Sequence, residues 1–128
     1  MKSFTLLYHD NAVTAIADGT SCVVSADDFL WEHFEQADSA ELDSAIEQED
    51  IPEVVMRALV ASETRPRCDQ IGDGALINLR GPAVETASDG DSLVSIRAWV
   101  HGNRVISVSR RGLAATSEVE QMMRSGAI

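Results

Sequence analysis

The sequence lacks a run of about 18 apolar residues, which is the length that a transmembrane helix requires. It also lacks a secretion signal, because the short apolar run near the N-terminus soon meets Tyr8, His9 and Asp10 and has no small-residue cleavage site after it. These two absences predict that this piece of chain lies in the cytosol. Its 128 residues are enough for a single domain with a substantial core.

The common catalytic and nucleotide-binding motifs are missing as well. There is no GxSxG, no P-loop and no GxGxxG, and Gly72-Asp73-Gly74 is typical of a turn. The three histidines form no HxxxH or HExxH pair. The sequence therefore predicts a protein that is not an enzyme and requires no cofactor.

Cysteines are few, and they are not paired in the sequence. Cys22 and Cys68 stand 46 residues apart and belong to no CxxC motif. In a cytosolic chain such cysteines are reduced, and we expect them to be small, partly buried residues.

Basic residues are almost absent from the first part of the chain. Residues 1–53 hold 13 of the 21 acidic residues against Lys2 alone, which leaves a net charge of −12. Residues 54–128 hold eight acids and nine bases, a net charge of +1. Nucleic acid is therefore excluded as a partner, since no phosphate-neutralising patch exists. The acidic part is either a solvated face or a surface that raises the local concentration of cations.

Short β-like runs and two helices are expected in the first half. Asp10-Asn11 is a turn signal between two strands, and the spacing of residues 31–34 favours a strand although it also allows a helical face. Ser39 can cap one helix, and Asp50 a second with Pro52 in its first turn, which ends before Pro66. The predicted strands are 4–8, 12–17, 21–25 and 31–34.

The second half is rich in β-structure. Strict alternation over residues 93–100 puts Trp99 on the more polar face, where we expect a helix or loop to cover it. Thr116 or Ser117 is expected to cap a final helix that runs to about Arg124. The further strands are 67–71, 75–79 and 105–109, with a loop over 81–91. The predicted class is α+β, a mixed, largely antiparallel sheet flanked by helices.

Metal-ligating residue types occur together at two places. His33 stands among acids that include Asp28 and Glu32, a set that could offer imidazole and carboxylate to zinc, although a solvated surface histidine is the alternative. Cys68, next to Asp69, is a second candidate. His33, Asp28, Glu32 and Cys68 are therefore the candidate metal ligands.

Arginines crowd the β-rich half, and several lie in or beside predicted strands. They could form ion pairs with the acidic helices, or they could meet the acids of a neighbouring subunit at an interface. These arginines are Arg65, Arg67, Arg80, Arg97, Arg104, Arg110 and Arg111.

Short motifs follow one another in a fixed order through the second half of the chain. They are Glu63-Thr64-Arg65-Pro66-Arg67-Cys68, Gly72-Asp73-Gly74, Asn78-Leu79-Arg80-Gly81, Val94-Ser95-Ile96-Arg97 with Trp99, Asn103-Arg104-Val105-Ile106-Ser107, and Arg110-Arg111. This ordered series resembles the cytoplasmic domain of ZntB-type zinc transporters, in the CorA superfamily of metal-ion transporters. The chain departs from the family pattern at two places. The loop 81–91 lacks the asparagine-rich sequence expected there, and Ser109 interrupts what is usually a longer run of arginines.

The resemblance implies an α/β/α-layered domain that assembles as a homopentameric funnel on the cytoplasmic side of the bacterial inner membrane. It implies a divalent metal ion as partner, with Zn²⁺ as the transported or sensed ion. Residues 1–128 would form a single cytoplasmic domain, whose stalk helix, two membrane helices and Gly-Met-Asn signature lie outside this sequence. We expect this piece alone to be monomeric or weakly associated. The alternative is a stand-alone acidic interaction module without transport.

Overall fold

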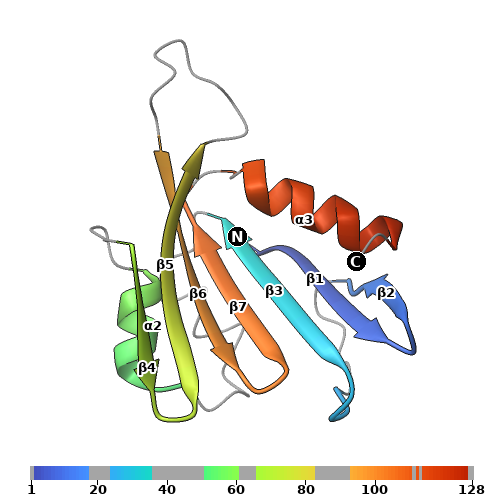
Figure 1. The fold of residues 1–128 in the computed structure, drawn as a ribbon, viewed down its shortest axis with the longest axis horizontal. Helices are drawn as coiled ribbons and strands as arrows, with labels where there is room; N and C mark the ends of the chain where they lie inside the picture. The colour runs from blue at the N-terminus through green and yellow to red at the C-terminus, as the bar shows by residue number, and fades with distance from the viewer. Residues whose placement is uncertain are drawn as a thin grey trace.

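The computed structural model describes residues 2–17, 24–35, 51–60, 66–82, 93–110, 112 and 114–126. Within these residues, seven strands form one mixed sheet in the order β2-β1-β3-β7-β6-β5-β4, and two helices pack on it (Figure 1). The elements are β1 (Lys2–His9), β2 (Ala12–Ala15), β3 (Phe29–Glu35), α2 (Glu53–Leu59), β4 (Arg67–Ile71), β5 (Gly74–Pro82), β6 (Leu93–His101), β7 (Arg104–Ser109) and α3 (Ala114–Ser125). The predicted α+β class with a largely antiparallel mixed sheet is confirmed.

Two-residue turns join three of the strand pairs. Asp10 and Asn11 connect β1 to β2 with φ angles of 51° and 62°, the backbone that a type I′ hairpin turn requires. Gly72 and Gly102 each take a positive φ at the first turn position of β4–β5 and β6–β7. Glycine adopts this conformation without steric cost, and Asp and Asn tolerate it at the β1–β2 turn, so these turn residues set the three registers.

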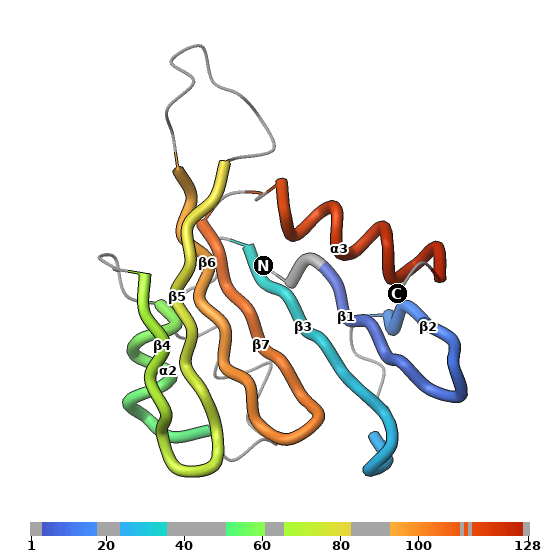
Figure 2. The backbone as a smooth tube through the Cα atoms, in the orientation of Figure 1, coloured from blue at the N-terminus to red at the C-terminus, as the bar shows by residue number. Residues whose placement is uncertain are grey.

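One parallel pair joins two antiparallel parts of the sheet. β3 pairs in parallel with β7, from Leu30 opposite Arg104 to Glu35 opposite Ser109. The other described pairs are antiparallel, so β2-β1-β3 and β7-β6-β5-β4 are two antiparallel units. Figure 2 traces β3 and β7 side by side at the centre of the sheet. We call this pair the seam.

The main hydrophobic core lies between the sheet and α2. Val55 and Leu59 of α2 are fully buried, four residues apart on one helix face as their spacing predicts. They belong to a cluster with Phe34, Leu76, Trp99, Ile106 and Val108. The predicted cover over Trp99 is thus α2, and the more polar face of β6 is the one that faces this core.

The opposite face of the sheet is crossed by α3. The C-terminal end of α3 lies beside Tyr8 and Val13, whose strands carry them on the face away from Phe34. Buried side chains beneath this layer include Leu6, Trp31 and His33. Helices therefore lie on both faces of the sheet, as the α/β/α expectation requires.

Several local expectations need correction. Pro52 is the N-cap of α2 and not part of its first turn, because it keeps an extended ψ of 142° while its carbonyl accepts the N–H groups of Val55 and Met56. Thr116 lies inside α3, which starts at Ala114, so neither Thr116 nor Ser117 is its cap. Cys68 is a free thiol as expected, yet it is exposed, because on edge strand β4 it lies on the face away from α2.

Other expectations fall wholly or partly on residues that the structure does not describe. The Ser39 helix, Cys22 and most of the loop 81–91 lie outside the described residues. The predicted strand 21–25 is described only at Val24 and Ser25, and neither is in a strand.

Candidate functional site

A buried polar cluster spans the seam on the face that α3 crosses. His33 of β3 is fully buried, with Nδ1 2.7 Å from the hydroxyl oxygen of Ser107 on β7. The indole N–H of Trp31 donates to the same oxygen at 2.8 Å, and Ser109 Oγ lies 3.4 Å from His33 Nε2. Phe4 packs near both aromatic neighbours, with its ring centroid 4.7 Å from that of Trp31 and 5.3 Å from that of His33. Side-chain hydrogen bonds thus tie β3 to β7 in addition to their backbone ladder.

Burial decides the protonation state of this histidine. It lowers the pKa of His33 to about 4, against a smaller opposing contribution from the backbone of Ser107. A neutral ring fits the contacts, since Ser107 can accept from Trp31 and donate to Nδ1 while Nε2–H points to Ser109.

His33 lies between a serine hydroxyl and a carboxylate, as the histidine of a hydrolytic Ser-His-Asp triad does. Glu35 Oε1 lies 3.8 Å from His33 Nε2, on the side of the ring away from Ser107. A nucleophilic serine must reach a substrate carbonyl, yet Ser107 is 1% exposed and already bonded to Trp31. The cluster therefore supports the strand pairing and offers no open reaction centre.

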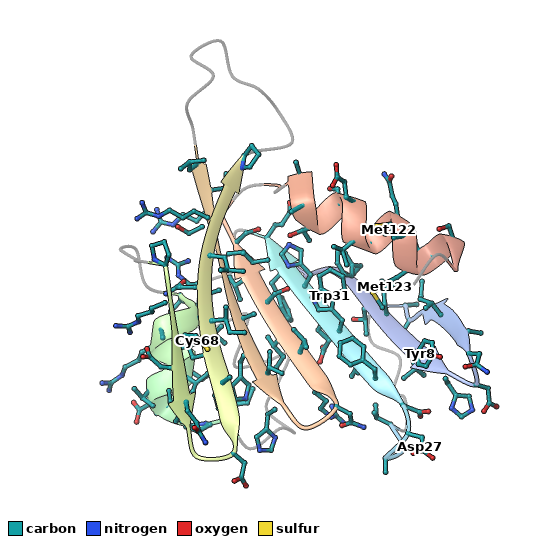
Figure 3. All side chains as sticks on the ribbon, viewed as in Figure 1. Tyr8, Asp27, Trp31, Cys68, Met122 and Met123 are labelled. Carbon is teal, nitrogen blue, oxygen red and sulfur yellow. The ribbon has the colours of Figure 1, made fainter. Side chains whose placement is uncertain are left out.

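The candidate metal ligands from the sequence do not meet. Glu32 lies on the α2 face, opposite to its neighbour His33, because successive strand residues alternate. Asp28 contacts His9, and Cys68 is on β4, four strands away from β3 in the sheet order. Figure 3 shows Trp31 and Cys68 well apart on the sheet. Within the described ranges, no group of three His, Cys, Asp or Glu side chains could hold a metal ion.

A second cluster of titratable groups was missed from the sequence. His9 ends β1, and its Nδ1 lies 2.6 Å from Oδ1 of Asp28, while its Nε2 lies 3.2 Å from Oδ2 of Asp10. The carboxylate of Asp28 is nearly buried and also accepts the backbone N–H of Ser25 at 2.9 Å. A gap of 19 residues separates His9 from Asp28, so no local motif could have revealed the pair.

The contacts in this cluster shift the pKa values of His9 and Asp28. The hydrogen bond to Asp28 raises the pKa of His9, and the charges of Asp10 and Asp28 add to the effect. The same bond, with the Ser25 N–H, lowers the pKa of Asp28. The contribution of His9 to stability is thus full below its ordinary pKa and is lost as the pH rises through its raised folded value.

The arginines take both buried and exposed positions. Arg97 is 3% exposed on the α2 face of β6, and burial together with the nearby charge of Arg110 lowers its pKa. Three other arginines form local ion pairs, which are Arg57–Glu53, Arg67–Asp69 and Arg124–Glu120. Pairing with the acidic segment 36–50 lies outside the described residues and stays a prediction.

Comparisons with known proteins agree with this fold. The family model described as "CorA-like Mg2+ transporter protein" matches residues 26–127. The zinc transport protein ZntB of Pectobacterium carotovorum is 29% identical over 108 residues, which is 84% of this chain and 33% of that protein. ZntB of Klebsiella pneumoniae is 31% identical over 104 residues, 81% of this chain and 32% of that protein. The chain spans about a third of the length of these curated relatives.

Solved structures match almost the whole chain. The ZntB cytoplasmic domain from Vibrio parahaemolyticus matches with a TM-score of 0.81 and 18% identity, covering 98% of this chain and 50% of that one. The full-length CmaX protein matches with a TM-score of 0.85 and 19% identity, covering 98% of this chain and 39% of that one. Fold and family model together define the class, a CorA-like α+β domain. The chain belongs to the CorA family and is a ZntB-type domain within it.

In the described part of the chain, neither α2 nor α3 has the length and hydropathy that a membrane-spanning helix requires.

Proposed function

We propose that this chain is the cytoplasmic domain of a membrane transporter for divalent cations, with zinc as the transported ion. The observation that carries the proposal is the match of 98% of the chain to the Vibrio ZntB cytoplasmic domain. Relatives named zinc transport proteins, at 28–31% identity over most of the chain, support zinc as the cargo. In this proposal the domain attracts cations, helps to regulate the pore and contributes to a homopentamer at the inner membrane.

The negative charge of the N-terminal part supports the proposal that this domain attracts cations. Residues 1–53 carry a net charge of −12, and a surface of one sign raises the local concentration of the opposite ion. Such attraction acts over about 30 Å at 0.01 M salt but about 8 Å at 0.15 M. Zinc should therefore reach the protein more slowly as inert salt is added.

Transport is tested with the complete product of the gene, reconstituted in liposomes that hold a zinc-sensitive dye. We expect zinc to enter faster than in protein-free liposomes, and native mass spectrometry to find five copies. If zinc does not enter at any salt concentration, the transport proposal is wrong. A water-soluble gene product without zinc flux would instead favour the acidic interaction module.

A further inference from the structure

We propose that His9 and Asp10 bind a zinc-type transition-metal ion at the β1–β2 turn, and that Asp28 holds the imidazole in position. The site lies away from the seam, at the sheet end where Tyr8 and Asp27 are drawn in Figure 3. The inference goes beyond the proposed function, because it rests on three side chains and not on transport.

The first step of the argument is the orientation of the imidazole. Nδ1 of His9 is 2.6 Å from the carboxylate of Asp28, which accepts hydrogen bonds and cannot donate when ionised. Nδ1 therefore carries the proton, and in the neutral ring the lone pair lies on Nε2. A metal-binding histidine typically donates its other N–H to a carboxylate in this way, which fixes the ring and strengthens its basicity.

Asp28 is itself fixed firmly enough to serve this purpose. Its side chain is 4% exposed, and its second oxygen accepts the N–H of Ser25. The carbonyl of Ser25 in turn accepts the side-chain amide of Asn103 at 2.8 Å, which anchors the segment to the β6–β7 turn. The orienting carboxylate is thus part of the folded framework, whereas the ring of His9 is half exposed.

The second step is the distance between the two proposed ligands. Zinc binds imidazole nitrogen and carboxylate oxygen at about 2.0–2.2 Å in tetrahedral geometry, which places two ligand atoms about 3.4 Å apart. Nε2 of His9 and Oδ2 of Asp10 are 3.2 Å apart, close to this value. The type I′ turn fixes the backbone of Asp10 next to the strand end, and water would complete the shell.

Charge and ligand chemistry select the ion. Among the residues that the structure describes, Asp10 and Asp28 are the charged groups that contact His9, so the neutral ring stands beside two negative charges. Imidazole suits zinc, copper and nickel, whereas magnesium prefers an all-oxygen shell. Zinc should therefore bind here and magnesium should not.

The test is a zinc chloride titration of the protein at pH 8, followed by NMR spectra of the three imidazole rings. We expect the His9 ring resonances to shift with half-saturation below about 1 mM zinc, and magnesium chloride to leave them unchanged. Before zinc is added, the His9 ring should show the Nδ1–H form that Asp28 imposes.

Variants separate this site from zinc bound elsewhere. His9→Gln should abolish the strongest zinc binding measured by calorimetry. Asp28→Asn should weaken it about 10–100-fold and remove the Nδ1–H preference. His101→Gln is the matched control, because His101 ends β6 before a two-residue turn as His9 ends β1. It should leave zinc binding unchanged.

Two results would overturn the inference. One is an absence of any His9 shift up to 1 mM zinc, and the other is full zinc affinity in a folded His9→Gln variant. Neither result bears on transport, since the liposome experiment can succeed with zinc bound at another place. Conversely, zinc bound at His9 in a protein that moves no zinc would refute the proposed function alone.

Discussion

Replacing Gly74 by alanine should lower the free energy of unfolding by about 3 kcal/mol, because the new methyl group would overlap a buried ring. A Cβ built on Gly74 would lie 2.3 Å from Cη2 and 2.5 Å from Cζ2 of Trp99. Trp99 is 5% exposed and packs in the core with Leu76 and α2, so the indole has little free space into which to move.

Urea unfolding of the wild type and the Gly74→Ala variant measures this cost directly. Gly102→Ala is the matched control, because its Cβ would have nothing within 4 Å while its φ of +59° is strained for alanine. That strain costs about 1–2 kcal/mol, so the control should lose less stability. In a Trp99→Phe background the penalty at Gly74 should shrink. An equal penalty in both backgrounds would show that Trp99 is not its source.

The arrangement at Gly74 shows what a single sequence can and cannot predict. The glycine pair around Asp73 indicated a turn, and the alternation from Leu93 to Val100 indicated a strand, since both are local signals. The sequence also predicted a cover over Trp99, but not which element supplies it, because α2 is distant from Trp99 in the sequence. Arg97 gives the face of β6 that carries Trp99 a polar composition. That face is nevertheless buried, because Trp99 packs against α2.

Long-range pairing limited the prediction of both clusters. The parallel contact of β3 with β7 joins residues that are more than 70 positions apart, so the environment of His33 could not be read from its acidic neighbours. Glu32 alternates to the other face and Asp28 contacts His9, whereas Glu35 stays on the face of His33. The family resemblance was available because it depends on the order of motifs and not on three-dimensional contacts.

Acid should destabilise the protein through His33. Its pKa is about 4 in the folded protein and ordinarily 6.5, so between these values the unfolded chain binds the extra proton. Stability therefore is full above pH 6.5 and falls as the pH drops toward 4. Between pH 7.5 and pH 4.5 the loss from this residue should be about 2.5 kcal/mol.

The contribution of His33 is isolated by comparing its loss of stability with that of a variant that cannot titrate there. Urea unfolding at pH 7.5 and pH 4.5 should show a smaller loss for His33→Gln than for the wild type, by about 2.5 kcal/mol. His101→Gln removes an exposed histidine and should keep the wild-type loss. The NMR signals of the His33 ring should still be those of a neutral imidazole at pH 5. A ring that gains its proton near pH 6.5, with equal losses in the wild type and His33→Gln, would mean that the seam tolerates a charged histidine. In that case the Ser107 hydroxyl would have to reorient to accept from Nδ1, while Ser109, also on β7, would go on accepting from Nε2.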